Sequence, residues 1–172
     1  IKPSNINRQI IATSRNNNKY KTREWKKRIK LINKNVSVNI INAYITLDNI
    51  ELLFGEKYDY MIDACDTTRV KVELIKRCHQ NDIKLVSSMG TAKKLDATKL
   101  IITTLDKTNT DPLAKKVRHE LGKDKDLMKD VVVVTSTEKA IDTKNMLGSS
   151  AFVPAVAGLY ITNYIVKDVT KM

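Results

Sequence analysis

Two carboxylates follow an apolar run near the middle of the chain. Residues 58–65 are largely apolar, and Asp63-Ala64-Cys65-Asp66 close the run. This pattern is typical of a central strand buried on both faces, and ligands of open α/β sheets bind outside the carboxyl ends of the strands. Mg²⁺ takes one or two carboxylates plus phosphate oxygens, so Asp66 is a candidate magnesium ligand. The open alternative is that Asp66 only caps the next helix.

Arg8 and Lys21 could supply a second chemistry, the binding of phosphate. Arginine offers a planar fork for phosphate oxygens, and lysine offers a mobile point charge. Neither stands out by itself among 31 Lys and Arg residues, for which a solvated surface role is the default. Their meaning depends on their order in the chain relative to Asp66.

These side chains need a scaffold, and the sequence predicts one. The strand at 58–65, the helix that Asp66 or Thr67 caps, and a strand at 83–87 are joined by short links, a rhythm that indicates a doubly wound, mainly parallel, Rossmann-like α/β sheet. We expect the helix to place Val70, Leu74, Ile75 and Cys78 on its apolar side and Lys71, Lys76 and Arg77 on its polar side.

The other predicted elements follow from apolar spacing and caps. Before the first strand we expect a helix-prone segment at 5–14, an amphipathic helix at 20–33, a β-rich run at 36–41, and a two-turn helix from residue 47 that stops near Gly55. After the first strand–helix–strand unit we expect strands at 100–105 and 131–135 and, between them, a helix that Asp111 caps and that runs through Leu121. A C-terminal helix at 152–166 would pack on the core or on a partner. Strands and a helix are thus added after the first strand–helix–strand unit.

Composition narrows the possible classes. The chain has 172 residues, 42% of them hydrophobic, and no run of about 20 apolar residues that would cross a bilayer. A net charge of +12 favours a polyanionic partner such as RNA, or else reflects solvated lysines. Two cysteines and two histidines in no ligand spacing argue against zinc, and free, buried thiols suit a reducing, cytoplasmic setting.

The order of the motifs resembles a known superfamily. Ser4-Asn5-Ile6-Asn7-Arg8-Gln9, then Lys21, then Asp63-x-x-Asp66 are similar, in sequence and spacing, to the motifs of the ubiquitin-activating-like ThiF/MoeB/HesA enzymes. The resemblance implies a single ThiF-type adenylating domain at 1–172 that uses ATP and Mg²⁺.

The same resemblance implies roles for individual residues. Arg8, Lys21 and Asp66 would be the catalytic residues, with Arg8 and Lys21 on the phosphates and Asp66 on Mg²⁺. The other ATP-binding residues would be Ser4, Asn5, Asn7, Gln9 and Thr67. The implied chemistry is attack of a carboxylate on the α-phosphate, which demands positioning and charge neutralisation.

One feature of the superfamily does not appear in the sequence. Its members place a strand, a glycine-rich phosphate turn, a helix and a second strand ahead of the first motif, and the five glycines form no such turn. We therefore expect the domain to be N-terminally incomplete as given, and to bind ATP poorly alone. Whether residues are also absent around 139–147 stays open.

Within the superfamily, the chain resembles the tRNA threonylcarbamoyladenosine dehydratases. The resemblance rests on residues 60–66, 88–92, 111–118, 136–138 and 148–158. It implies tRNA as substrate and a homodimer, and makes Lys115, Lys116 and Arg118, with His119 beside them, candidate RNA contacts; an ordinary solvated helix face remains the alternative.

Two rival functions remain from the sequence. One is adenylation of the C-terminus of a ubiquitin-like sulfur carrier, although the paired CxxC motifs usual in those activators are missing here. The other is a non-catalytic module that binds RNA or a partner protein. Cys65 could serve a redox or sulfur relay, but no base or second thiol stands near it in sequence, which favours a structural role.

Overall fold

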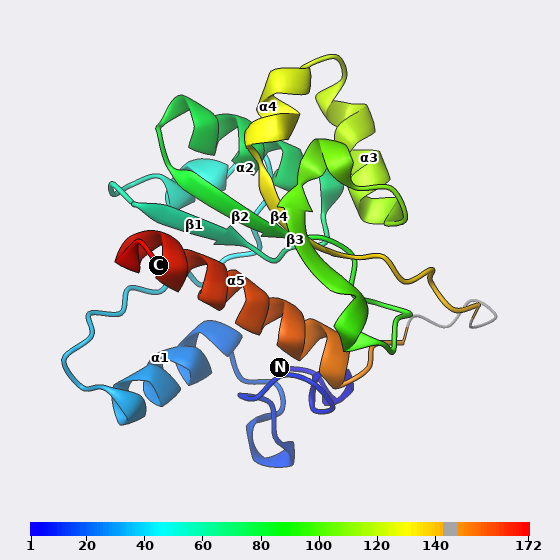
Figure 1. Cartoon of the computed structure of the whole chain (residues 1–172). Coiled ribbons are helices and arrows are strands. Elements are labelled where there is room, and N and C mark those ends of the chain that lie inside the picture. The colour runs from blue at the N-terminus through cyan, green and yellow to red at the C-terminus, as the bar shows by residue number, and fades with distance from the viewer. Residues whose placement is uncertain (143–147) are drawn as a thin grey trace.

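A mixed four-stranded sheet forms the centre of the molecule (Figure 1). The computed structural model describes residues 1–142 and 148–172. The strands are β1 (Tyr60–Asp63), β2 (Lys84–Ser88), β3 (Leu100–Thr104) and β4 (Val132–Ser136), in the order β1-β2-β4-β3. The first three strands of that order run parallel, and β3 is antiparallel to β4. The expected mainly parallel α/β fold is thus confirmed, with one antiparallel edge.

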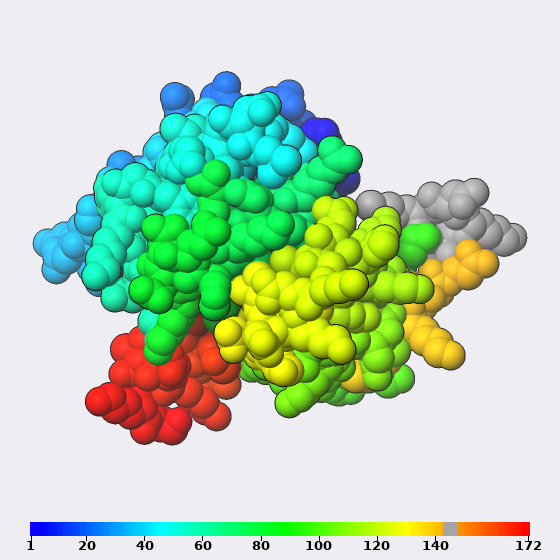
Figure 2. Space-filling view, turned by 90° about the horizontal axis from the view of Figure 1, so that it is seen from above, coloured from blue at the N-terminus to red at the C-terminus, as the bar shows by residue number. Residues whose placement is uncertain are grey.

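Helices cover both faces of the sheet. They are α1 (Lys21–Ile32), α2 (Thr68–Gln80), α3 (Pro112–Leu121), α4 (Lys125–Asp130) and α5 (Phe152–Thr170). In Figure 1, α2, α3 and α4 lie on one face of the sheet and α5 crosses the other. Figure 2 looks onto the first face, where α4 is yellow and the C-terminal end of α5 projects in red.

The alternation of side chains along β2 and β4 explains this layering. Leu85 and Val133 point into the core cluster shared with α2, α3 and α4. Val86 and Val134 point the opposite way and pack against the Val153 side of α5. Because both strands bury both faces, they read as apolar runs in the sequence, and the predicted strands at 83–87, 100–105 and 131–135 agree with the observed ones to within one residue.

Several expected elements differ. Residues 36–41 form no strand, and residues 5–14 form turns after a short 3₁₀ helix at Pro3–Asn5 instead of an α-helix. The two-turn helix expected from residue 47 is a 3₁₀ helix at Ile50–Leu53, and α4 was not expected at all. β-branched residues favour strands, but the described residues offer the 36–41 run no paired neighbour.

The part of the chain before β1, residues 1–59, is here called the N-terminal arm. Its helix α1 buries none of its residues, and Leu31 and Ile32 are exposed. The amphipathic pattern correctly predicted α1 as a helix but not its exposed apolar side. Ile50 is buried and packs with Val70 and Leu74 of α2. The arm therefore meets the sheet layers at few points. No helix among the described residues has both the length and the apolarity to cross a membrane.

Candidate active site

A buried ion pair lies at the carboxyl end of β1. Lys71 Nζ lies 2.6 Å from Asp63 Oδ2, and both side chains are fully buried. The ammonium also donates to Ser87 Oγ at 3.1 Å and to the Ser88 carbonyl at 2.9 Å, and Ser87 Oγ donates to Asp63 Oδ2 at 2.7 Å. The prediction that Lys71 lies on the polar side of its helix is therefore wrong, because a complete set of acceptors compensates the burial of its charge.

The other oxygen of Asp63 shapes the turn that carries Asp66. Asp63 Oδ1 accepts the backbone N–H of Cys65 at 3.0 Å, which links the buried pair to the loop directly after β1. Asp66 is exposed, and its carboxylate makes no hydrogen bond or ion pair with the described residues. Thr67 is the N-cap residue of α2 and makes no side-chain cap bond. Asp66 thus caps nothing, and its oxygens are available to a ligand.

A pocket of about 290 Å³ opens beside Asp66. Its lining comes from four segments: the start of α2, the loop after β2, the beginning of α3, and the segment after β4. The lining residues are Asp66, Thr68, Gly90, Ala92, Lys93, Lys94, Asp111, Pro112, Leu113, Lys116 and Ala140. The pocket lies where open α/β sheets bind ligands, at the carboxyl ends of the strands.

A second buried ion pair builds the back of this pocket. Lys94 Nζ lies 3.0 Å from Asp111 Oδ2, with both side chains almost fully buried. Asp111 Oδ1 accepts the backbone N–H groups of Leu113 and Ala114, which confirms its predicted role as the N-cap of α3. A Cβ on Gly90 would lie 3.1 Å from Asp111 Oδ2, so a side chain at residue 90 would require Asp111 to shift by a few tenths of an ångström.

The first motif, residues 4–9, forms a turn near the N-terminus of α5. Arg8 Nη1 donates to the Ser4 carbonyl at 2.7 Å and to Asn7 Oδ1 at 2.9 Å. Asn7 Nδ2 reaches the Ser149 carbonyl at 2.8 Å. Asn5 is buried, and its carbonyl accepts the N–H groups of Arg8 and Gln9. The guanidinium is thus folded back on its own turn.

The three expected catalytic residues occupy separate places. Lys21 is the exposed first residue of α1. Arg8 lines a shallow hollow with residues of its own turn and Ala151, whereas Asp66 lines the pocket described above. Thr67 stands beside Asp66 in the loop. Asp66 therefore lines a pocket, whereas Arg8 and Lys21 lie on the N-terminal arm.

The expected RNA contacts also divide. Lys115 and Lys116 are exposed on α3, and Lys116 borders the Asp66 pocket. Arg118 is half-buried and donates to the Thr108 hydroxyl and, at 3.4 Å, to the Leu105 carbonyl. Arg118 therefore has partners inside the protein, while the two lysines remain open to solvent.

The chain is similar in sequence to a known protein family. The sequence profile of the ThiF family matches residues 1–172. The chain belongs to the ThiF family. It is 37% identical over 98% of its length to the tRNA threonylcarbamoyladenosine dehydratase of Bacillus subtilis, covering 73% of that protein. The enzyme of the same name from Haemophilus influenzae is 32% identical over 98% of this chain and 72% of its own.

A solved structure agrees with the sequence comparison. The Escherichia coli tRNA threonylcarbamoyladenosine dehydratase, crystallised in complex with ATP, superimposes with a TM-score of 0.92 at 32% identity, covering 99% of this chain and 72% of that one. The same enzyme in complex with AMP gives a TM-score of 0.91. This ThiF-family chain therefore shares its whole described architecture with an enzyme solved with both nucleotides.

The two thiols of this ThiF-family chain are poorly reactive. Burial, with a smaller contribution from the Asp63 carboxylate, raises the pKa of the Cys65 thiol to about 12 from an ordinary 9.0. Burial raises the pKa of Cys78 to about 11. Both cysteines are free. Because the thiolate is the nucleophile, these values favour the structural role over a relay.

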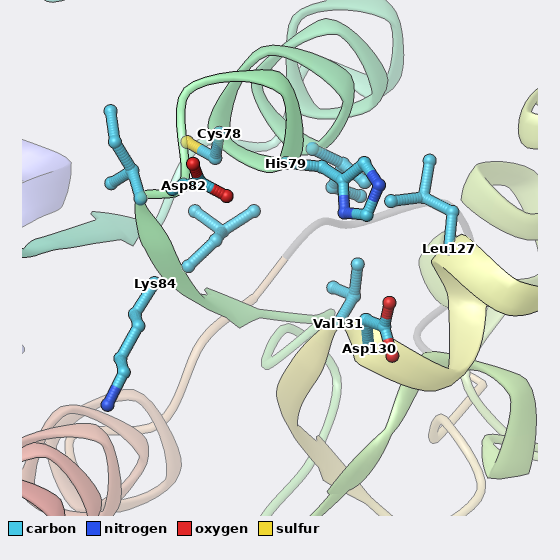
Figure 3. A pocket seen from close by; sticks show the side chains of 10 residues that line it. Cys78, His79, Asp82, Lys84, Leu127, Asp130 and Val131 are labelled. Carbon is cyan, nitrogen blue, oxygen red and sulfur yellow. The ribbon is translucent and has the colours of Figure 1, made fainter.

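A different hollow, of about 250 Å³, lies at the opposite, amino-terminal edge of β2 and β4 (Figure 3). His79, Asp82 and Asp130 line it with apolar residues, and Lys84 extends away from it toward α5, where its Nζ pairs with Asp168 at 2.7 Å. Among the described residues, no three His, Cys, Asp or Glu side chains gather to hold a metal ion. Within the part of the chain that the structure describes, this hollow therefore offers no candidate metal site.

Sequence reasoning missed the residues that hold the site in place. Nothing in the pattern distinguishes Lys71 and Lys94 from the many solvated lysines. The only available signal was Asp111-Pro112, which predicted the helix cap but not the lysine that pairs with it. Gly90 lay within a stretch noted only for family resemblance.

Proposed function

We propose that this protein is an ATP-dependent dehydratase that cyclises the threonylcarbamoyl group of modified adenosine in tRNA. The observation that carries the proposal is the 37% identity to the Bacillus subtilis dehydratase over 98% of the chain. The match of the described fold to the enzyme solved with ATP supports it.

The reaction has two steps that balance. A threonyl carboxylate oxygen bonds to the α-phosphorus of ATP, the bond from that phosphorus to its bridging oxygen breaks, and pyrophosphate leaves. The carbamoyl group of the same nucleoside then attacks the activated acyl carbon and gives up one proton, and AMP leaves. The net change in the nucleoside is the loss of one water, driven by ATP. Neither step needs a protein nucleophile, which agrees with the raised pKa of both thiols.

The residue roles follow from charge and position. Mg²⁺ would neutralise phosphate charge, and the free carboxylate of Asp66 suits it, since this ion prefers one carboxylate with phosphate oxygens. Arg8 and Lys21 would bind the phosphates. For Arg8 this requires exchanging its bonds to Ser4 and Asn7 for phosphate oxygens. Ser4, Asn5, Asn7, Gln9 and Thr67 would complete the contacts to ATP.

The RNA is proposed to approach over α3. Lys115 and Lys116 are exposed there, and a net charge of +12 favours a polyanion. Arg118 is proposed to support this surface from behind, because its guanidinium is engaged with the protein. If charge reversal of Lys115 and Lys116 leaves the tRNA affinity and its salt dependence unchanged, this surface is not the contact.

The proposal also covers the domain organisation, the location in the cell and the oligomeric state. Residues 1–172 would act as one adenylating domain in the cytoplasm. Two copies would associate through the outward side of α5, where the exposed residues Phe152, Leu159 and Val166 recur at heptad spacing and the exposed Val169 follows three residues later. Light scattering of the purified protein tests the dimer: a monomer mass at micromolar concentration would remove it.

The function is tested by incubating the purified full-length protein with ATP, Mg²⁺ and tRNA that carries the modification. The expected result is AMP release together with loss of 18 Da from the modified nucleoside, the mass of one water. AMP release that responds to a small carrier protein ending in Gly-Gly, and not to tRNA, would support the carrier-activating alternative. Binding of tRNA without AMP release would support a non-catalytic module.

A further inference from the structure

The pocket beside Asp66 contains more positive charge than the protein itself neutralises. Lys94 and Asp111 neutralise each other as a buried pair. Lys93 is half-buried, Lys116 is exposed, and neither side chain makes an ion pair or hydrogen bond with the described residues. An anion in the pocket would give these two lysines the charged partner that the described residues do not offer them.

Lys93 also has an unusual backbone. Its φ is +60°, in the left-handed region that non-glycine residues seldom occupy. Two backbone bonds hold it there: Lys93 N–H donates to the Gly148 carbonyl at 2.9 Å, and the Lys93 carbonyl accepts from Ile141 N–H at 2.8 Å. Strained residues of this kind persist where the surroundings over-determine them, and they cluster at ligand sites.

Hydrogen bonds hold another part of the pocket wall. Glu138 accepts the N–H groups of Leu95 and Asp96 at 3.0–3.1 Å, so the end of β4 fixes the loop just beyond Lys93. Gly90 leaves bare backbone against Asp111. The pocket is thus a built cavity, with Asp66 on one wall and, among its other lining residues, two lysines whose side chains have no partner among the described residues.

We propose that this pocket binds the free carboxylate of the threonylcarbamoyl group, with Lys93 as its main counter-charge and Lys116 at its rim. The inference rests on the proposed function, and it adds the place where the reacting group enters. The carboxylate must reach the α-phosphorus near the metal that Asp66 would hold, and a pocket that shares the Asp66 wall satisfies that requirement. Lys93 orients the carboxylate by a charge-assisted hydrogen bond.

The test measures the affinity of two tRNAs that differ only in the modification. The full-length protein is titrated with modified and unmodified tRNA in the presence of Mg²⁺ and an ATP analogue with a methylene group between the α- and β-phosphorus, so that no adenylate forms. The wild type is expected to bind the modified tRNA about tenfold or more tightly. Lys93→Gln is expected to lower that ratio to nearly one and to leave the affinity for unmodified tRNA within about twofold.

The controls separate charge from structure. Lys93→Arg keeps the charge and should keep most of the discrimination. Lys123→Gln removes an exposed lysine on the turn after α3, outside the pocket, and should keep all of it. Thermal unfolding of each variant reports whether the fold survives.

Three results overturn the proposal. The first is a wild type that binds both tRNAs equally. The second is a Lys93→Gln variant that weakens both by the same factor, which would mean an RNA phosphate contact. The third is a Lys93→Gln variant that leaves both affinities unchanged. AMP release by the wild type with ATP, measured in parallel, tests the proposed function separately. An active wild type whose discrimination is unaffected by Lys93→Gln would refute only the pocket assignment.

Discussion

The loops at the carboxyl ends of the strands and the N-terminal arm carry the two halves of one motif set, yet they are held very differently. Asp66 follows a turn anchored by the buried Lys71–Asp63 pair, and its pocket is closed by the buried Lys94–Asp111 pair. Arg8 and Lys21 lie on an arm whose helix buries no residue.

The difference separates two ways of building a binding site. At the strand ends, interior hydrogen bonds hold the turn that carries Asp66, the proposed metal ligand, before any ligand arrives. On the arm, Arg8 rests against its own turn and Lys21 faces solvent, so in the proposed site the nucleotide itself would have to draw these cations into place. Preorganised charge lowers the cost of binding, and we expect the arm to pay that ordering cost on binding ATP.

The largest effect should follow from breaking the anchor under Asp66. Lys71→Met leaves Asp63 buried without its cation, and loss of one partner of a buried pair costs about 3–5 kcal/mol in the free energy of unfolding. Urea unfolding followed by circular dichroism measures it.

The matched control is the double variant Lys71→Met with Asp63→Asn, which removes both charges and should recover part of that loss. A single variant that loses less than about 1 kcal/mol would show that the pair anchors little.

The next effect should appear in activity alone. Asp66→Asn removes the proposed metal charge and should lower kcat/KM for AMP release about 100-fold or more. Because Asp66 is exposed and has no partner among residues 1–142 and 148–172, the free energy of unfolding should stay within about 0.5 kcal/mol of the wild type. The rate of AMP release is measured in stopped assays at several Mg²⁺ concentrations. Near-normal activity of the variant would rule out the metal role.

These two regions also differ in how well the sequence predicted them. Apolar runs in the sequence predicted the buried strands β2 and β4, and Asp111 predicted the start of its helix. Both signals are local in the sequence. Lys71 and Lys94 gave no local sign of burial, because their partners lie 8 and 17 residues away in the chain and meet them only in the folded sheet.

In the N-terminal arm, the sequence predicted a strand that the structure does not form. Residues 36–41 have a strand's composition, but a strand needs a paired neighbour, and the sequence of one segment cannot supply it. The missed helix α4 did carry a signal, since Asp124 accepts the N–H of Leu127 as an N-cap. At six residues it is too short to show apolar periodicity.

A smaller effect is expected where the pocket wall is tightest. Gly90→Ala places a methyl group 3.1 Å from Asp111 Oδ2, and such overpacking costs about 1–3 kcal/mol. Thermal unfolding should show a lower midpoint, and the KM for tRNA should rise because the pocket wall shifts. The comparison variant is Gly55→Ala on the arm, where nothing lies within 4 Å of the added carbon; if both variants behave alike, the close approach is unimportant.

A pH effect should arise from the core. The pKa of Cys78 is raised on folding from 9.0 to about 11, so the unfolded chain loses this proton first as the pH rises. The stabilisation present below pH 9 should therefore fall between about pH 9 and 11, by at most about 2.7 kcal/mol. Cys78→Ala should show a flatter decline over that range than the wild type, and parallel declines would contradict the assignment.

The smallest effect is expected on the arm. Ile32→Ala alters a side chain that is 74% exposed at the end of α1, and such surface changes stay within about 0.5 kcal/mol. Ile50→Ala, at a fully buried position of the same arm, should instead cost about 2–5 kcal/mol. Denaturant midpoints of the two variants would show whether the arm is held only at its few buried points.

The most direct measurement is a crystal structure of the full-length protein with ATP and Mg²⁺. The account predicts Asp66 on the metal in the position it has here, with Arg8 released from Ser4 and bonded to a phosphate, and Lys21 beside the same triphosphate. A structure in which ATP is bound while the guanidinium, the ammonium and the Asp66 carboxylate point to different places would contradict it.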